Sequence, residues 1–231
     1  MRKYDVVYIL KAGCGPGELR FSLRSIEANM DHGKVWFYCG KPDGLIPDEA
    51  VPLKQSGETK WERVRYSLRQ ICQNDNITKK FWLFNDDFYV MAPMEKAVVY
   101  HRGLLSDHIA GIKARRNGRQ SGYSENLQRC MDQLQQAGCT TLDYAIHIPM
   151  LIDRQKMLET LDMFPSCPMF RSLYGNYAQI GGEFHHDVKT VDPGKVIPED
   201  ADFFSTGNRA FTGRVLDQLQ KRFPDPCKYE R

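Results

Sequence analysis

Apolar runs alternate with amphipathic segments over the first 100 residues of the chain. Continuous apolar runs rich in β-branched and aromatic residues are typical of buried strands, and a 3.6-residue apolar period is typical of helices. Strands are predicted at 4–10, 34–39 and 80–85. Helices are predicted at 18–29 and 58–73. In the first helix, Leu19, Leu23 and Ile26 lie at helical spacing. The predicted order is strand, helix, strand, helix, strand.

This order favours an α/β fold. Each predicted strand is apolar on both faces, which indicates a mostly parallel sheet covered by helices on both sides. We therefore predict a Rossmann-like mixed sheet, mostly parallel and flanked by helices. In such sheets, ligands bind beyond the carboxyl ends of the strands. The glycine-rich loop KAGCGPG (11–17) and the acidic step NDDF (85–88) both follow strands, so we expect them to meet in one cleft.

The second half of the chain has a looser pattern. A polar segment extends to about residue 122. Further elements are predicted as helices at 123–138, 153–164 and 214–223 and a strand at 183–191. No internal repeat is evident, and the length favours a single domain spanning 1–231. We expect the second half to extend the same sheet.

Composition narrows the class of protein further. Hydrophobic residues make up 42% and charged residues 26%, an ordinary globular mixture. No apolar stretch approaches the ~20 residues that a membrane span needs, and the start MRKYDVVYIL does not resemble a cleavable signal. The seven cysteines are scattered without a C-x-x-C pair, which argues against a disulfide framework or a zinc ribbon. We expect a cytoplasmic protein without a membrane span.

The stretch FWLFNDDFYVM (81–91) places Asn85, Asp86 and Asp87 inside an apolar, aromatic run. Adjacent carboxylates in such surroundings repel each other and lose hydration, so a bound cation would stabilise them. Oxygen ligands without cysteine favour Mg²⁺ or Mn²⁺, which complete their shells with water and substrate phosphates. The predicted substrate is therefore a diphosphate. The alternative is an acidic turn that caps a neighbouring helix.

Other candidates carry weaker signals. The loop around Gly13 permits close backbone approach to a nucleotide, but it lacks the spacing of a dinucleotide fingerprint or a P-loop. Of Lys60, Arg63 and Arg65, at most two can face a diphosphate, because the three do not share one helical stripe. His186, beside His185, could complete a cation's shell, although adjacent strand residues face opposite sides.

The chain resembles a known family over nearly its whole length. Five stretches occur in the order of the signature blocks of the Stealth family, which are sugar-phosphate transferases of capsule synthesis and lysosomal enzyme tagging. These stretches are DVVYIL (5–10), ELRFSLRSIEAN (18–29), FWLFNDDFYV (81–90), HIPMLI (147–152) with FRS (170–172), and RFPDPCKYE (222–230). The acidic step also resembles the D-x-D step of GT-A glycosyltransferases, whose metal holds the diphosphate of a nucleotide sugar. The resemblance thus implies a GT-A-type fold.

The resemblance also implies roles for individual residues. Asp86 and Asp87 match the family's metal-site acids, and Arg20 and Arg24 match its helix that faces the nucleotide-sugar. His147 and Arg171 match its later catalytic histidine and arginine. By its residues alone, His147 in YAIHIPM is more typical of a satisfied core position. The expected site is catalytic at His147, Asp87 and Arg171, donor-binding at Gly13, Arg20, Arg24, Lys60, Arg63, Asn85 and Asp86, and metal-binding at Asp86, Asp87 and His186.

The expected function is transfer of a sugar from a nucleotide-sugar, most simply a UDP-sugar, to an acceptor hydroxyl with Mg²⁺ or Mn²⁺. Residues 1–100 would form the nucleotide-sugar and metal half, and 101–231 the acceptor and catalytic half. The basic run KARRNGRQ (113–120) raises hydroxymethylated DNA as an acceptor beside a glycan, which would place the enzyme in a bacterial cytoplasm or a phage-infected host cell. One alternative is a sugar-1-phosphate transferase. The other is a non-catalytic nucleotide-sugar-binding module. The stretch STGNRA (205–210) favours this module, because the Stealth family usually has an Asn-Asp pair at that place.

Overall fold

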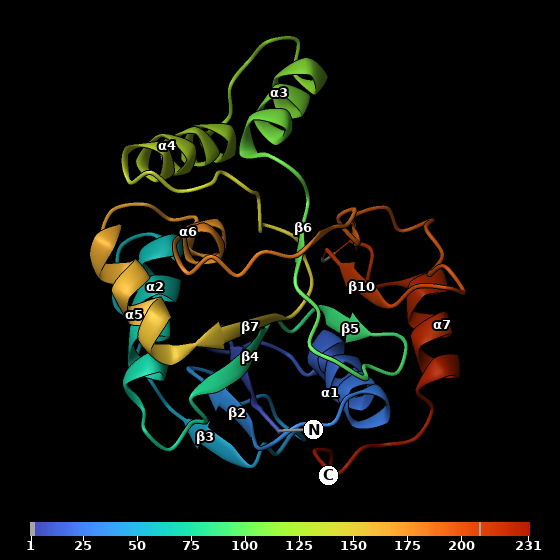
Figure 1. Cartoon of the computed structure of the whole chain (residues 1–231). Coiled ribbons are helices and arrows are strands. Elements are labelled where there is room, and N and C mark those ends of the chain that lie inside the picture. Colours follow the sequence, from blue (N-terminus) through green and yellow to red (C-terminus); the bar gives the residue numbers. More distant parts are fainter. Residues whose placement is uncertain (1–2, 208) are drawn as a thin grey trace.

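A five-stranded sheet lies at the centre of the protein, in the order β3-β2-β1-β4-β7 (Figure 1). The computed structural model describes residues 3–207 and 209–231. The strands are β1 (Asp5–Ile9), β2 (Val35–Tyr38), β3 (Glu49–Val51), β4 (Lys80–Phe84) and β7 (Met150–Asp153). The first four are parallel, and β7 pairs antiparallel with β4. The predicted class, a mostly parallel α/β sheet flanked by helices, is confirmed.

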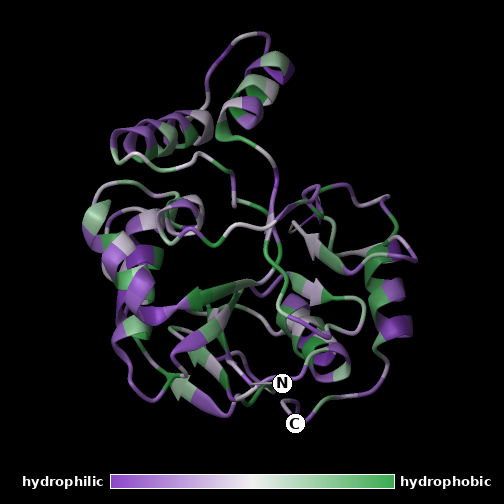
Figure 2. Ribbon diagram, in the orientation of Figure 1, coloured by the Kyte–Doolittle hydropathy of each residue, from purple (hydrophilic) through white to green (hydrophobic). Residues whose placement is uncertain are grey.

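Both faces of the sheet are buried, as the apolar runs predicted. Along β1, Val6 and Tyr8 pack toward α1 (Gly17–Asn29), while Val7 packs toward α2 (Lys60–Gln73) and α5 (Arg154–Met163). This alternation follows from the two-residue period of a strand. Because both faces of β1 are buried, its apolar run is not interrupted by a polar residue at every second position. Figure 2 shows hydrophobic colour along β4 and β7 and hydrophilic colour on the outer side of α7 (Gly213–Arg222).

The pairing of β1 with β4 fixes where the site can form. Tyr8 lies opposite Phe84, so the two parallel strands end at the same edge of the sheet. The loop after β1 and the acidic step after β4 therefore start side by side. The expected shared cleft is not seen in the pocket described below, which is lined by Asn85 and Phe88 of the acidic step and by none of residues 11–17.

The chain leaves this sheet at the acidic step and enters a second, three-stranded sheet. That sheet has the order β5-β10-β9, with β5 (Phe88–Val90), β10 (Phe203–Thr206) and β9 (Lys189–Thr190). Asp86 and Asp87 thus lie at the junction of the two sheets. The expectation that the second half extends the first sheet holds only for β7. The strand expected at 183–191 is two short strands, β8 (Glu183–Phe184), which pairs with β6 (Tyr100–His101), and β9.

A helical arm, formed by α3 (Leu105–Arg115) and α4 (Gly122–Gln136), projects from the body (Figure 1). The expectation of an irregular polar segment up to residue 122 is wrong for α3, whose Leu105, Ile109 and Ile112 are buried against α4. The base of the arm packs on Leu173 of α6 (Phe170–Tyr177). Among the helices formed by residues 3–207 and 209–231, none has the length and apolar character needed to cross a membrane.

An ion pair ties α1 to the carboxyl-terminal segment. Arg24 donates two hydrogen bonds to the carboxylate of Glu230, at 2.6 and 2.8 Å, and another to the carbonyl of Phe223 at 2.9 Å. The side chains of Arg24 and Glu230 are only 12% and 8% exposed. Arg20 lies 3.1 Å from the same carboxylate. A bidentate, partly buried pair of this kind is costly to break because the remaining charge stays buried.

Replacing Arg24 with methionine should therefore lower the free energy of unfolding by about 3 kcal/mol, the low end for a broken buried pair because Arg20 still faces Glu230. Urea unfolding followed by circular dichroism measures the change. The matched control is Lys34→Met, which removes an ion pair whose partners are 56% and 42% exposed. An effect of Arg24→Met no larger than that of the control would contradict the structural role of this pair.

Candidate functional site

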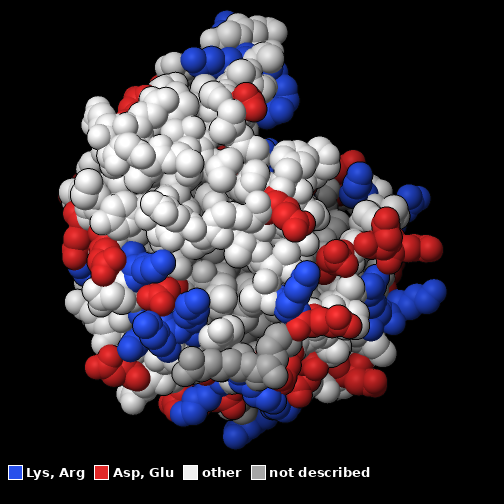
Figure 3. All heavy atoms as spheres, in the orientation of Figure 1, with Lys and Arg blue, Asp and Glu red and all other residues white. Residues whose placement is uncertain are grey.

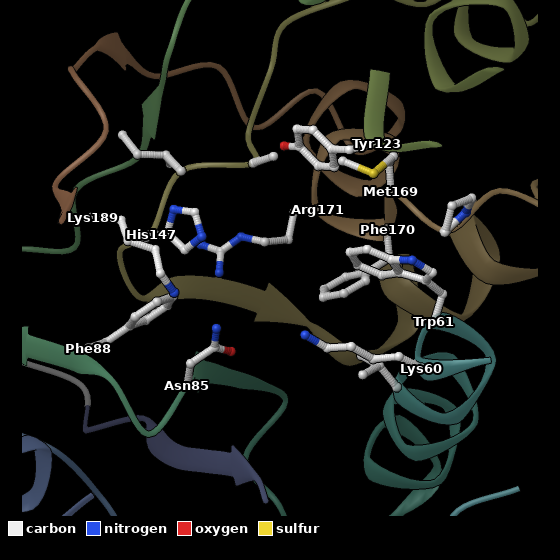
Figure 4. Close-up of a pocket in the computed structure, with 14 residues that line it drawn as sticks. Lys60, Trp61, Asn85, Phe88, Tyr123, His147, Met169, Phe170, Arg171 and Lys189 are labelled. Carbon is white, nitrogen blue, oxygen red and sulfur yellow. The ribbon is translucent and has the colours of Figure 1, made fainter. Parts of the chain in front are cut away.

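A pocket opens beyond the carboxyl end of β4, between α2, α6 and the second sheet (Figure 4). Its polar lining comprises Lys60, Asn85, His147, Arg171 and Lys189. Its apolar walls include Trp61, Phe88, Tyr123, Met169 and Phe170. The volume is about 220 Å³, which is below the ~300–1,000 Å³ typical of small-molecule sites, so a larger ligand would extend past the mouth. The pocket draws residues from both halves of the chain.

Local structure places each wall. A capping box between Thr59 and Glu62 starts α2, which brings Lys60 and Trp61 into the first turn beside the pocket. Arg171 lies in the first turn of α6, with its guanidinium 5.7 Å from the centroid of the Phe88 ring. Aromatic faces beside cationic groups form a lining that suits an anionic ligand with a planar ring.

Asp87 is the most constrained acid of the site. The residue is 7% exposed, and its Oδ2 accepts hydrogen bonds from Lys189 Nζ at 2.7 Å and from Ser205 Oγ at 3.2 Å. Its Oδ1 is buried and has no hydrogen-bond partner among the described residues. A buried carboxylate oxygen without a donor is costly, and a bound cation would satisfy it.

Negative charge accumulates around this carboxylate. Burial raises the pKa of the Asp86 carboxyl, and the charge of Asp87 raises it further. Burial likewise raises the pKa of Glu18, against a hydrogen bond that Thr206 Oγ1 donates at 2.7 Å, and Asp87 and Asp86 add to the rise. Burial raises the pKa of the Cys14 thiol, and the charge of Asp86 raises it further. This agrees with the pairing of β1 and β4, which starts the loop after β1 beside the acidic step.

These carboxylates fit a hard divalent cation. Asp87 Oδ1 and the Asp86 carboxylate would supply oxygen ligands of the type that Mg²⁺ and Mn²⁺ prefer. Within residues 3–207 and 209–231, no group of three or more His, Cys, Asp and Glu side chains is arranged to hold a metal by itself. Mg²⁺ usually keeps one or two carboxylates and takes its remaining ligands from water and substrate phosphates.

His147 is held by a second carboxylate. Its Nδ1 lies 2.9 and 3.0 Å from the two oxygens of Asp187, and its backbone N–H donates to Asp187 Oδ1 at 3.1 Å. Arg102 donates to the other oxygen of Asp187 at 3.2 Å. The ring packs edge-on against Phe88. With Nδ1 engaged, Nε2 is the ring nitrogen left to exchange a proton with a ligand in the pocket.

The environment keeps Asp187 ionised. Burial alone raises the pKa of the Asp187 carboxyl, but the hydrogen bonds and charge of His147, together with Arg102, outweigh it and lower the pKa from 3.8 to about 2. Arg171 is also perturbed, because burial lowers its pKa to about 10. It therefore stays cationic at neutral pH, and it donates to the carbonyl of Ile148.

Several expected site residues lie outside the pocket. Arg20 and Arg24 face Glu230, because they lie about one and two turns into α1 and the carboxyl-terminal segment engages both guanidinium groups. Arg63 points back to the carbonyls of Gly57 and Glu58 and supports the start of α2. Gly13 lies in the loop after β1, exposed and with a positive φ of 71°.

His186 is exposed and packs edge-on against Phe184 instead of approaching the acidic step. The chain between β8 and β9 turns the next residue, Asp187, toward His147. Neighbouring residues of an extended segment point to opposite sides, so the two cannot both face the pocket. Of the expected residues, the structure brings Lys60, Asn85, His147 and Arg171 into the lining of the pocket. Asp86 and Asp87 do not line it, and Asp87 is connected to it by its ion pair with the lining residue Lys189.

Sequence reasoning missed the partners of these groups. Lys189 and Asp187 are far from Asp87 and His147 along the chain, so no local pattern pairs them. Trp61 and Tyr123 lie in the first turns of α2 and α4 and line the pocket. In the sequence, both look like ordinary helix residues. The one available signal was the spacing of Asp187 and Lys189, which are two residues apart in the strand predicted at 183–191 and would lie on one side of it.

The fold and site together define a mixed α/β protein with a cationic and aromatic pocket beside paired carboxylates. No family model matches the chain, and no curated protein matches it either.

Replacing Asp187 with asparagine should destabilise the protein at neutral pH by about 2 kcal/mol, the free energy that corresponds to lowering a carboxyl pKa from 3.8 to about 2. The lowered pKa makes this stability present above about pH 4 and lost as the pH falls toward 2. Urea unfolding from pH 7 downward should show the gap between wild type and variant narrowing in that window. Asp75→Asn, at a 97% exposed side chain, is the control. A gap that does not depend on pH would contradict the ionised pair.

Proposed function

We propose that the protein is a divalent-metal-dependent transferase that moves a sugar from a nucleotide-sugar, most simply a UDP-sugar, to an acceptor hydroxyl. The observation that carries the proposal is the combination of the carboxylate-held His147 in the pocket lining with Asp87, whose buried Oδ1 has no hydrogen-bond partner among the described residues and whose Oδ2 pairs with the lining residue Lys189. Asp87 suits a cation and His147 suits a general base. Both are needed when a hydroxyl attacks an atom next to a diphosphate.

Asp86 and Asp87 would hold Mg²⁺ or Mn²⁺. When bound, the cation supplies electrostatic stabilisation of the charge that develops on the diphosphate leaving group. This arrangement supports a GT-A-type assignment of the sheet, which the mostly parallel order with an antiparallel β7 permits.

The pocket walls suit the rest of the donor. Lys60, Arg171 and Lys189 present positive charge to the diphosphate, and Asn85 adds an amide. Trp61 and Phe170 offer apolar surface at the far side of the pocket, where a nucleobase or sugar ring would pack (Figure 4).

His147 would take the proton of the acceptor hydroxyl at Nε2. Asp187 fixes the ring's orientation at Nδ1 and stabilises the imidazolium that forms. Because Asp187 stays ionised, it supports this role throughout the neutral range.

Two alternatives share the site. Attack on the β-phosphorus would make the protein a sugar-1-phosphate transferase, as the Stealth resemblance implies. A protein that binds the donor without reacting would be a nucleotide-sugar-binding module. The carboxylate-held histidine favours a reaction over binding alone.

Incubation of the protein with Mn²⁺, UDP- and GDP-sugars and acceptors should release nucleoside diphosphate, detected by mass spectrometry. Release of nucleoside monophosphate would identify phosphosugar transfer, and binding without product would identify the module. His147→Ala should lower turnover by about 10²–10⁴-fold yet retain nucleotide binding, because the general base acts only in the chemical step.

The matched control for this variant is His186→Ala, at an exposed histidine outside the pocket. Its turnover should equal that of the wild type. A loss of activity and of Mn²⁺ binding in His186→Ala would restore the expectation that this residue is a metal ligand. Full activity in His147→Ala would contradict its role as the base.

The helical arm favours a polyanionic acceptor, such as hydroxymethylated DNA, over a neutral glycan. Residues 108–124 contain four cations and no acid, and Arg115, Arg116 and Arg119 are exposed. Figure 3 shows Lys and Arg gathered over the arm. Tyr123 of α4 lines the pocket, so a polyanionic acceptor bound at the tip of the arm would pass the mouth of the pocket. Arginine forks suit phosphate groups.

The double variant Arg115→Ala with Arg116→Ala should weaken binding of a hydroxymethylated duplex and reduce the slope of log K against log[salt] by about 2, since each phosphate contact contributes about 0.9. Fluorescence anisotropy over a salt series measures both. Lys79→Ala with Lys80→Ala removes the same charge at the opposite edge of the sheet and should leave the slope nearly unchanged. Equal slopes for both doubles would point to an uncharged acceptor.

A further inference from the structure

Lys189 occupies one side of the carboxylate that would hold the metal. Its ammonium lies 2.7 Å from Asp87 Oδ2, and Ser205, its register partner across β9 and β10, donates to the same oxygen at 3.2 Å. Asp87 Oδ1 receives nothing from the described residues. The carboxylate is thus compensated on one oxygen and left open on the other.

The ammonium also has access to the pocket. Lys189 is one of the lining residues, and its side chain is 26% exposed. Figure 4 shows its terminal nitrogen beside Phe88, close to His147 and Arg171. A lysine has a flexible stem and a compact charge, so it can exchange one anionic partner for another without moving the backbone.

A divalent cation and this ammonium would compete for one carboxylate. A cation held by Oδ1 would share one carboxylate with the ammonium, and the two positive charges would repel each other. Without a diphosphate, the cation must therefore displace the Lys189 ammonium, which is then left without an anionic partner. With a diphosphate present, the released ammonium gains phosphate oxygens in its place.

We propose that Lys189 is a built-in counter-ion of Asp87, which the divalent cation displaces and which then binds the diphosphate of the donor. The proposal rests on the proposed function, because it takes Mn²⁺ and a nucleoside diphosphate as ligands. Its consequence is positive coupling: each ligand strengthens the binding of the other, and Lys189 supplies part of that coupling. The site would then take up cation and donor together and hold the cation weakly when the donor is absent.

The test measures Mn²⁺ binding to the whole protein by electron paramagnetic resonance at neutral pH, alone and with saturating UDP or GDP. In the wild type, the nucleotide should tighten Mn²⁺ binding by about tenfold or more, within the usual range of coupling between two ligands. In Lys189→Met, Mn²⁺ alone should bind more tightly than in the wild type, and the coupling should fall by about fivefold without disappearing. The part that remains is direct contact between the cation and the phosphates.

The control is Lys60→Met, which removes a pocket lysine that has no hydrogen bond or ion pair with Asp87 among the described residues. It should weaken nucleotide binding but change the coupling by less than about threefold, since it does not free the carboxylate. Lys189→Gln serves as a second variant, and thermal melting verifies that each variant is folded.

The outcomes are distinguishable. Equal coupling in Lys189→Met and the wild type, or no coupling in the wild type itself, would overturn the proposal while leaving a nucleotide site in place. Nucleotide binding that is unaffected by chelator and lost in Lys189→Met would also overturn it, because Lys189 would then replace the cation. If neither UDP nor GDP binds with or without Mn²⁺, the proposed function fails as well.

Discussion

A carboxylate removed from water must be compensated, and the burial of Asp87 imposes this requirement on the candidate site. The residue follows the central sheet's β4 and precedes β5 of the second sheet, so it cannot turn outward without disturbing the junction. Lys189 and Ser205 satisfy one of its oxygens. Its other oxygen has no hydrogen-bond partner among the described residues, so negative charge remains uncompensated at this junction, next to Asp86.

One short segment links the two chemically distinct parts of the site. Asp187 orients His147, and Lys189, two residues later, holds Asp87. The backbone N–H of Lys189 also faces Asp187 Oδ1, at 3.4 Å. Asp187 thus lies two residues before β9, which Lys189 begins. A ligand that shifts Lys189 would thus act on a segment that also positions His147, so in the proposed function donor binding and acceptor activation would share one physical support.

Local patterns predicted much of the first 100 residues and less of the remainder. The apolar runs became β1, β2 and β4, and the helical spacing became α1 and α2. These elements are long or strongly apolar, so their hydrophobic pattern distinguishes strand from helix clearly. The helix α3 was missed because only Leu105, Ile109 and Ile112 mark its buried face and Gly111 interrupts it. The short strands β6, β8 and β9 have two residues each and exist only through their partners.

The sequence by itself determined which segments are buried and that Asn85, Asp86 and Asp87 interrupt a buried run, because burial and periodicity are local properties of the chain. The tertiary structure decided the partners: Lys189 for Asp87, Asp187 for His147, and Glu230 for Arg24. These pairs are separated by 102, 40 and 206 positions. A charge carries no local signal of its partner, so only the packing of the two sheets and the path of the returning chain assign one.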